Sequence, residues 1–86
     1  MAYTTGKLAA ITGAGSGIGR ALALQLNRAG CELYLSDISS AGLEETVALL
    51  ERKDIAASSQ QLDVADKAAV HAWAEQIAAE QGRVDI

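Results

Sequence analysis

The feature that most constrains the fold is a glycine-rich segment between two apolar stretches. Residues 12–19 read Thr-Gly-Ala-Gly-Ser-Gly-Ile-Gly, and they follow the short apolar run 8–11. Glycine permits backbone angles that a Cβ atom forbids, and it allows the backbone to come close to a phosphate. The first N–H groups of a helix that starts after such a turn attract an anion, as does the helix dipole. The segment therefore predicts a phosphate-binding turn between a strand and a helix.

The spacing of the glycines distinguishes among the known phosphate-binding loops. A triphosphate loop needs two glycines five residues apart, followed by Lys and Ser or Thr, and no pair here fits. The fingerprint G-x-G-x-x-G also fails, because its third glycine would fall on Ile18 or Arg20. The pattern that fits is G-x-x-x-G-x-G, at Gly13, Gly17 and Gly19. A purely structural glycine loop is the alternative, although four glycines in seven positions favour a bound ligand.

Strand-like and helix-like segments alternate along the rest of the chain. Apolar residues at helical spacing after the turn predict one helix face, formed by Ile18, Leu22, Leu26 and Ala29, with Gly30 ending the helix. A strand is expected at 32–37, followed by a helix that Ser39 or Ser40 caps and whose apolar face is Leu43, Val47 and Leu50. A weaker strand is expected at 55–62. The last expected helix is capped by Asp66, ends at Gly82 and has Val70, Trp73, Ala74 and Ile77 on one side, and a further apolar run follows at 84–86. This alternation predicts an α/β fold with right-handed crossovers and a parallel sheet.

The length of 86 residues is enough for one small domain, and no linker or repeat divides it. In the dinucleotide-binding strand order, the strand at 8–11 lies in the middle of the sheet, and one of its neighbours would follow residue 86. We therefore expect residues 1–86 to form the N-terminal part of a single NAD(P)-binding domain. Because one strand edge would be bare, we expect the 86-residue polypeptide alone to be marginally stable and to self-associate.

Composition and charge exclude several other classes of protein. Half of the residues are apolar and the net charge is -4, which is typical of a globular chain rather than a disordered one. No basic run is longer than Arg52-Lys53, so neither nucleic acid nor an anionic membrane is an expected partner. The apolar run at 8–11 is too short for a signal peptide or a membrane span. These features predict a cytoplasmic protein.

A few conspicuous side chains are expected to be structural. Cys31 is the only cysteine and is interpreted as a small buried residue in a reducing compartment. Trp73 and Tyr34 are expected to pack against helices or strands, and His71 is expected to face solvent. Since the chain has one cysteine and one histidine, no metal site is expected.

The motifs together resemble those of the short-chain dehydrogenase/reductase family. The glycine turn with Thr12 before it resembles the cofactor motif of that family, and Asp37 and the pair Asp63-Val64 end the second and third expected strands where the family has them. The resemblance covers essentially the whole chain but only about the first third of a typical member. It implies a Rossmann-type doubly wound parallel sheet, truncated after β-α-β-α-β-α.

The resemblance also implies a set of cofactor-binding residues. The pyrophosphate and the adjoining ribose would be held by Gly13, Ser16, Gly17, Ile18 and Gly19. Asp63 would bind the adenine amino group, and Val64 would supply a backbone contact to the same ring. For Asp63, a turn residue ahead of a helix is the alternative.

Asp37 favours one of the two nicotinamide dinucleotides. It follows Gly19 by 18 residues, close to the spacing of an acid that binds the adenosine ribose. A hydrogen bond to a charged group is worth roughly 1.5–3 kcal/mol, whereas a 2′-phosphate would face a like charge. Ile38, which follows Asp37, is also expected to be a cofactor-binding residue. Neither Ile38 nor Ser16 is basic, and Arg20 is expected on the solvent face of its helix. We therefore expect NAD(H) to be preferred over NADP(H), with a surface turn aspartate as the alternative.

The resemblance implies an oxidoreductase that acts on CH-OH groups, with an alcohol or ketone substrate and a homo-oligomeric parent protein. The catalytic Ser, Asn, Tyr and Lys of the family would lie beyond residue 86, so we expect no catalytic residue and no turnover from this chain alone. Tyr3 and Lys7 precede the first strand and are not interpreted as that pair. A non-catalytic dinucleotide-binding module for sensing or scaffolding is the alternative. A flavodoxin-type domain is disfavoured, because it needs neither the glycine turn nor Asp37.

Overall fold

The strands form a parallel sheet with the order β1-β2-β3. The computed structural model describes residues 8–81. Its elements are, in chain order, β1 (Leu8–Ile11), α1 (Gly17–Arg28), β2 (Glu32–Asp37), α2 (Ser40–Leu49), β3 (Ala57–Gln61) and α3 (Lys67–Gln81). The alternation of strands and helices confirms the α/β fold predicted from the sequence. Gly82 and the apolar run 84–86 lie outside the described residues.

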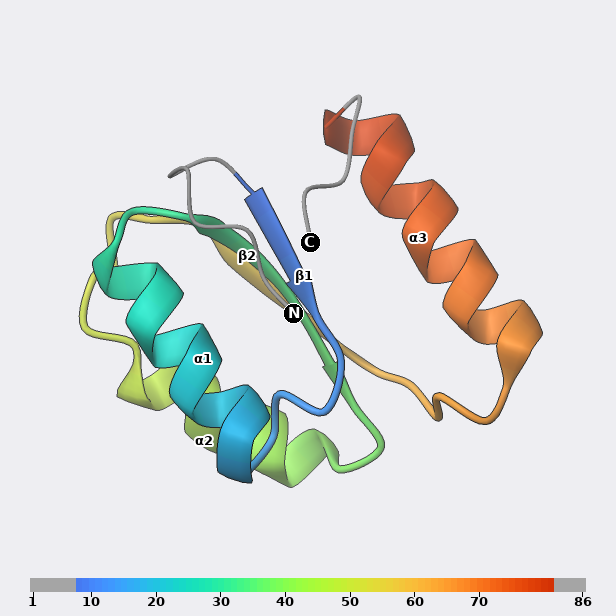
Figure 1. The fold of residues 1–86 in the computed structure, drawn as a ribbon, viewed down its shortest axis with the longest axis horizontal. Coiled ribbons are helices and arrows are strands. Elements are labelled where there is room, and N and C mark those ends of the chain that lie inside the picture. The colour runs from blue at the N-terminus through green and yellow to red at the C-terminus, as the bar shows by residue number, and fades with distance from the viewer. Residues whose placement is uncertain (1–7, 82–86) are drawn as a thin grey trace.

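The helices cover both faces of the sheet, with α1 and α2 on one side and α3 on the other (Figure 1). The side chains of β1 show why both faces must be covered. Ala9 and Ile11 belong to the buried cluster beneath α1 and α2, whereas Leu8 and Ala10 belong to the cluster beneath α3. A strand that is apolar on both sides is typical of a parallel sheet with helices on both faces. The fold is therefore doubly wound, as predicted.

The register of the strands brings their carboxyl ends to one edge of the sheet. Ile11 lies opposite Leu35, and Asp37 lies opposite Gln61. The backbone N–H of Leu62 donates to the carbonyl of Asp37 at 2.9 Å, which continues the pairing one step beyond β3. The segments that follow the three strands consequently lie close together.

Local signals set the starts of α2 and α3 and the end of α1 as predicted. The Ser39 hydroxyl accepts a bond from the N–H of Gly42 at 3.0 Å at the start of α2, and Asp66 accepts one from Ala69 at 3.1 Å at the start of α3. Such caps satisfy N–H groups that have no acceptor within the helix. Gly30 follows α1 with a φ of 93°, a left-handed angle that suits glycine after a helix.

The buried face of α1 agrees with the predicted one at Leu22 and Leu26, which pack in the core, and differs at its two ends. Ile18 is 89% exposed and Ala29 is also exposed, whereas Ala23, Leu26 and Asn27 are buried. The Asn27 side chain bonds the backbone N–H and C=O of Arg52, at 2.9 and 3.1 Å. Apolar periodicity could not identify Asn27 as part of this face, because it is a polar residue that is buried with satisfied hydrogen bonds.

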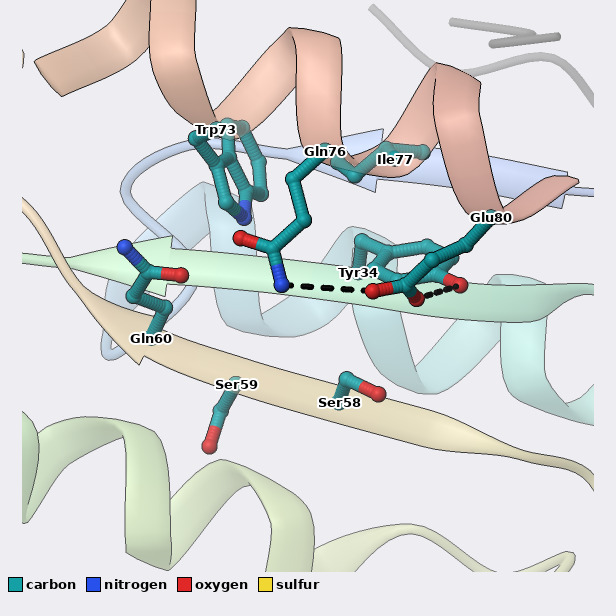
Figure 2. A pocket seen from close by; sticks show the side chains of 8 residues that line it. All are labelled: Tyr34, Ser58, Ser59, Gln60, Trp73, Gln76, Ile77 and Glu80. Carbon is teal, nitrogen blue, oxygen red and sulfur yellow. Dashed lines mark hydrogen bonds between the residues drawn. The ribbon is translucent and has the colours of Figure 1, made fainter. Parts of the chain in front are cut away.

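The third strand is shorter than the predicted 55–62 and is mostly exposed. Between it and α3 lies a small hollow with polar walls (Figure 2). Tyr34 and Gln76 both donate to the carboxylate of Glu80, at 3.1 and 3.2 Å. Trp73 packs in the core there and is 7% exposed, as predicted. None of the helices between residues 8 and 81 is both long and apolar enough to cross a membrane.

Candidate functional site

The glycine turn lies at the carboxyl edge of the sheet, between β1 and α1. The N–H of Ala14 donates to the carbonyl of Ser36 at 2.9 Å, which fixes the turn against β2. In open parallel sheets, ligands bind in the crevice outside the carboxyl ends of the strands. The predicted site residues therefore stand at the position where this fold binds ligands.

The glycines of the turn serve two different physical needs. Gly13 and Gly17 have φ angles of 67° and 57°, which L side chains rarely adopt. At Gly19, a Cβ atom would collide with the carbonyl oxygen of Gly13. The first two glycines thus allow the chain to turn, and the third allows the helix to lie against the turn.

The first turn of α1 offers backbone donors. Ser16 occupies the position before the helix in an extended conformation, and its hydroxyl accepts no bond from the first turn. No acidic side chain lies in that turn either. The first N–H groups of a helix have no acceptor within the helix, and the helix dipole adds partial positive charge there. The arrangement is suited to the oxygens of an anion.

Asp37 is held by two backbone amides at the end of β2. Its Oδ2 accepts a bond from the N–H of Gly15 at 2.8 Å, and its Oδ1 accepts one from Ser39 at 2.9 Å. The Ser39 bond, followed by the Gly15 bond, holds the pKa of the Asp37 carboxyl below its ordinary value. The carboxylate is therefore ionised at neutral pH, and each oxygen can accept a further hydrogen bond.

An open hollow of about 170 Å³ lies beside Asp37 and is lined by Gly13, Asp37, Ile38, Leu62, Asp63 and Val64. Five of the predicted cofactor residues thus line one hollow, and the other four, Ser16, Gly17, Ile18 and Gly19, follow Gly13 in the adjoining turn. Ile38 is 63% and Val64 58% exposed, although both are large and apolar. Asp63 accepts a bond from the N–H of Ala65 at 2.9 Å through Oδ1, so it also serves the turn before α3.

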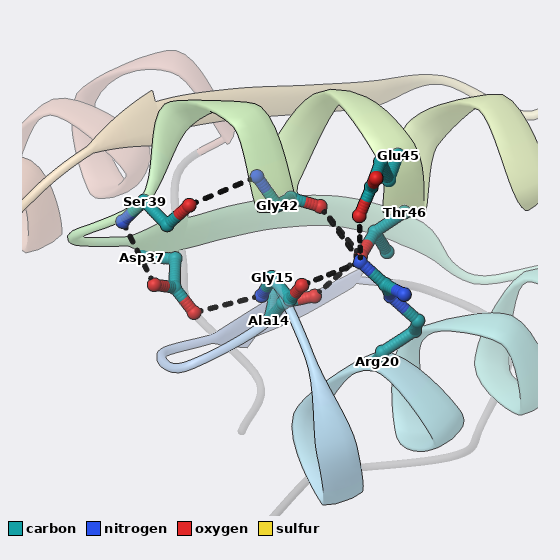
Figure 3. Close-up of polar contacts among 8 residues, drawn as sticks. All are labelled: Ala14, Gly15, Arg20, Asp37, Ser39, Gly42, Glu45 and Thr46. Carbon is teal, nitrogen blue, oxygen red and sulfur yellow. Dashed lines mark hydrogen bonds and ion pairs between the residues drawn. The ribbon is translucent and has the colours of Figure 1, made fainter.

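Sequence reasoning overlooked Arg20 and Thr46, which bond the backbone carbonyls of the glycine turn (Figure 3). The prediction that Arg20 lies on the solvent face is wrong. Its guanidinium donates to the carbonyl of Gly15 at 2.6 Å and to Thr46 Oγ1 at 2.9 Å, and its side chain is 25% exposed. A cation in the first turn of a helix is opposed by the dipole, which is a signal that Arg20 has other partners. Gly15 and Thr46 carried no comparable signal.

The side chains expected to be structural lie away from this site. The side chain of His71 is 77% exposed and pairs with Glu75 at 3.2 Å on α3. Cys31 is buried, as expected. Tyr34 lies on the α3 face of the sheet, as described above.

A doubly wound parallel sheet with a glycine turn at the start of its first helix defines a nucleotide-binding unit of the Rossmann type. A family model described as short chain dehydrogenase matches residues 7–86. The chain belongs to this short-chain dehydrogenase family.

Similar proteins agree with this membership. A Mycobacterium tuberculosis protein named as an oxidoreductase, SadH, is 48% identical over 84 residues, which cover 98% of this chain and 30% of that protein. The crystal structure of levodione reductase superposes with a TM-score of 0.85 at 38% identity, over 95% of this chain and 33% of that one. A short chain dehydrogenase/reductase from Burkholderia phymatum, solved in complex with NAD, gives a TM-score of 0.83 at 37% identity, over 98% of this chain and 30% of that one. The chain thus spans about a third of the length of each of these three proteins.

Proposed function

We propose that residues 1–86 are the N-terminal part of a single NAD(P)-binding domain in an oxidoreductase that acts on CH-OH groups. In this proposal the parent enzyme transfers hydride between a nicotinamide dinucleotide and an alcohol or carbonyl substrate. The observation that carries the proposal is the hollow at the carboxyl ends of the strands. It combines an ionised Asp37 with the exposed apolar side chains of Ile38 and Val64, directly beside the glycine turn.

Each part of a dinucleotide finds a suitable partner in this arrangement. The first turn of α1, from Gly17 to Gly19, would bind the pyrophosphate through backbone N–H groups. Asp37 would accept bonds from the ribose hydroxyls, and the side chains of Ile38 and Val64 would cover the faces or edges of the adenine ring. Asp63 would use Oδ2 for the adenine amino group, because its Oδ1 already accepts the Ala65 N–H.

The charge of the hollow supports a preference for NAD(H) over NADP(H). A 2′-phosphate would stand next to the ionised Asp37, and no basic side chain lines the hollow among the described residues. Arg20 does not line the hollow, and its guanidinium is held at the Gly15 carbonyl and at Thr46 and is paired with the Glu45 carboxylate at 3.1 Å. Like charges at close range therefore disfavour the phosphorylated cofactor.

The nicotinamide, when bound, supplies the hydride chemistry, and the protein supplies orientation and a proton donor. The residues of this chain would bind and orient the cofactor. Tyr34, the single tyrosine among residues 8–81, bonds Glu80 on the α3 face and is not placed to donate a proton at the turn. The catalytic residues and the substrate pocket would thus lie elsewhere in the parent protein.

The test is a calorimetric titration of the intact parent protein with NAD⁺ and, separately, with NADP⁺. We expect NAD⁺ to bind more tightly, and we expect Asp37→Ala to weaken NAD⁺ binding roughly ten- to a hundredfold while it narrows the gap between the two cofactors. Asp54→Ala is the matched control, because Asp54 pairs with Arg52 at 3.0 Å in the loop before β3. Tighter binding of NADP⁺ would reject the preference, and cofactor binding without any dehydrogenase turnover would favour a non-catalytic module.

A further inference from the structure

Gly15 is held at its backbone N–H and at its carbonyl by two different elements (Figure 3). Its N–H donates to Oδ2 of Asp37 at 2.8 Å, at the end of β2. Its carbonyl accepts a bond from the Arg20 guanidinium at 2.6 Å, on α1. A short charge-assisted hydrogen bond at each end fixes the orientation of the residue between them. Gly15 therefore connects the phosphate-binding turn to the carboxylate that faces the ribose.

Backbone angles do not explain why residue 15 is a glycine. Among residues 8–81, only Gly13, Gly17 and Gly30 have a positive φ, so Gly15 has a backbone conformation that other residues can adopt. The space around it gives a different reason. A Cβ atom at residue 15 would lie 2.9 Å from both Cγ and Oδ2 of Asp37, closer than real Cβ contacts allow. The Asp37 carboxylate therefore has space only because residue 15 has no side chain.

The turn cannot retreat from Asp37 to make room for a side chain. On its other side lies Gly42 of α2, where an added Cβ atom would be 2.7 Å from the Gly15 carbonyl oxygen. The Gly15 residue is therefore enclosed between a carboxylate and a helix backbone. A Cβ atom at residue 15 would push the Asp37 carboxylate aside, because a side chain rotates more readily than a packed helix shifts.

Arg20 and Thr46 hold this arrangement in place from α1 and α2. The guanidinium of Arg20 bonds the Gly15 carbonyl and, more weakly, the Gly42 carbonyl at 3.2 Å. Its Nε donates to Thr46 Oγ1, and that fully buried hydroxyl donates to the carbonyl of Ala14 at 2.7 Å. A planar guanidinium can serve several acceptors at once, whereas a lysine ammonium acts as a point charge.

We infer that Gly15 determines cofactor specificity through Asp37, and that Arg20 is the positioning residue for the Gly15 peptide. This inference rests on the proposed function. The hydrogen side chain of Gly15 allows the carboxylate to keep one oxygen on the Gly15 amide and the other on the Ser39 amide. The remaining acceptor sites of the carboxylate then face the ribose hydroxyls in a single orientation, so the site recognises an unmodified 2′-hydroxyl.

The experiment uses NAD⁺ and its analogue with a 2′-deoxyadenosine ribose as probes of the intact parent protein. In the wild type we expect the analogue to bind roughly ten- to a hundredfold more weakly, because it lacks the hydroxyl that Asp37 accepts. In Gly15→Ala we expect the two ligands to bind almost equally. A general loss of structure would weaken both ligands alike and leave their ratio unchanged.

A double-mutant cycle tests whether the effect of Gly15→Ala passes through Asp37. In the Asp37→Ala background, where the contacts to Cγ and Oδ2 are removed, we expect Gly15→Ala to change NAD⁺ affinity by no more than about twofold. Of the three close contacts with residue 37, the new methyl group then keeps only the one to the Cβ atom, at 3.2 Å, so the double variant provides a less strained reference. Additive losses in the two single variants would overturn the inference.

Arg20→Met and Arg20→Lys test the positioning role. We expect both variants to lower the preference for NAD⁺ over the deoxy analogue, and we expect Arg20→Lys to keep more of this preference than Arg20→Met. Arg28→Met is the matched control on the same helix, since Arg28 is half exposed and lies 4.0 Å from Glu51. An unchanged ratio in Arg20→Met would reject the role of Arg20. Absence of any dinucleotide binding by the wild type would instead reject the proposed function, and the inference with it.

Discussion

The two faces of the sheet are packed to different degrees. Among residues 8–81, a cluster of ten buried residues joins α1 and α2 to β1 and β2 on one face. On the face covered by α3, the same part of the chain contributes a cluster of five buried residues. An apolar hollow of about 460 Å³ lies beside α3 and β1, bordered by Ile18 and Leu22 of α1 and by Val70 and Trp73 of α3.

The candidate site stands on the better-packed side. Asp37 continues the alternation of Leu33 and Leu35, whose side chains face α1 and α2, and Arg20 and Thr46 also belong to those helices. The other face contributes to the site only through the segment after β3, which carries Asp63 and Val64. The contrast teaches that the residues proposed to bind the pyrophosphate and the ribose are held by packing and hydrogen bonds within this chain.

The largest expected effect comes from truncating one core residue on each face. Leu43→Ala should lower the free energy of unfolding by about 4 kcal/mol, because the Leu43 side chain of α2 is fully buried against the sheet. Ile77→Ala should cost about 2 kcal/mol, since Ile77 borders a hollow into which neighbouring side chains can relax. Urea unfolding of the intact parent protein measures both values.

Glu44→Ala, on the exposed side of α2, is the control for these two variants and should change the unfolding free energy by less than about 0.5 kcal/mol. An equal loss for Leu43→Ala and Ile77→Ala would contradict the difference in packing between the two faces.

A smaller effect is expected from removing the helix cap on each face. Ser39→Ala and Asp66→Ala should each cost about 1 kcal/mol of stability, because each leaves one N–H of its helix without an acceptor. Only Ser39→Ala should also weaken NAD⁺ binding several-fold, since Gly42 of α2 packs against Gly15. Parallel unfolding and binding titrations separate the two outcomes. A comparable loss of affinity in Asp66→Ala would show that the α3 face supports the site as strongly.

The smallest effect is expected from pH. Backbone N–H bonds from Ser39 and Gly15 lower the pKa of Asp37, so its carboxylate stays ionised from about pH 8 to about pH 5. A lowered pKa in the folded state gives stability above the unfolded pKa of about 3.9, and that stability is lost as the pH falls through the folded pKa. NAD⁺ affinity should therefore be flat across this range and fall only in more acidic solution.

Calorimetric titrations of the wild type, Asp37→Asn and His71→Gln measure this pH dependence. Asp37→Asn should remove the acidic decline. His71 is exposed on α3, so His71→Gln should leave the profile unchanged. A decline near neutral pH that Asp37→Asn abolishes would show that the backbone bonds do not hold the carboxylate ionised.

Most of the fold could be predicted because its signals are local. Apolar runs, the caps at Ser39 and Asp66 and the left-handed Gly30 depend on residues a few positions apart in the chain. The prediction of the α1 face was right at Leu22 and Leu26 but wrong at Ile18 and Ala29. It also missed Asn27, which is buried with hydrogen bonds to Arg52, 25 positions away. The solvent position predicted for Arg20 was wrong for the same reason, since its partners Gly42 and Thr46 belong to α2.

The sequence by itself determined the glycine turn, the alternation of strands and helices, and the acid at the end of the second strand. These depend on backbone angles and on periodicity, which a linear pattern records. Only the tertiary structure showed that Gly15 is enclosed between Asp37 and Gly42, and that Arg20 holds its carbonyl. The reason is physical: close approach and a shared hydrogen-bond network arise from side chains that meet after the sheet and its helices have packed.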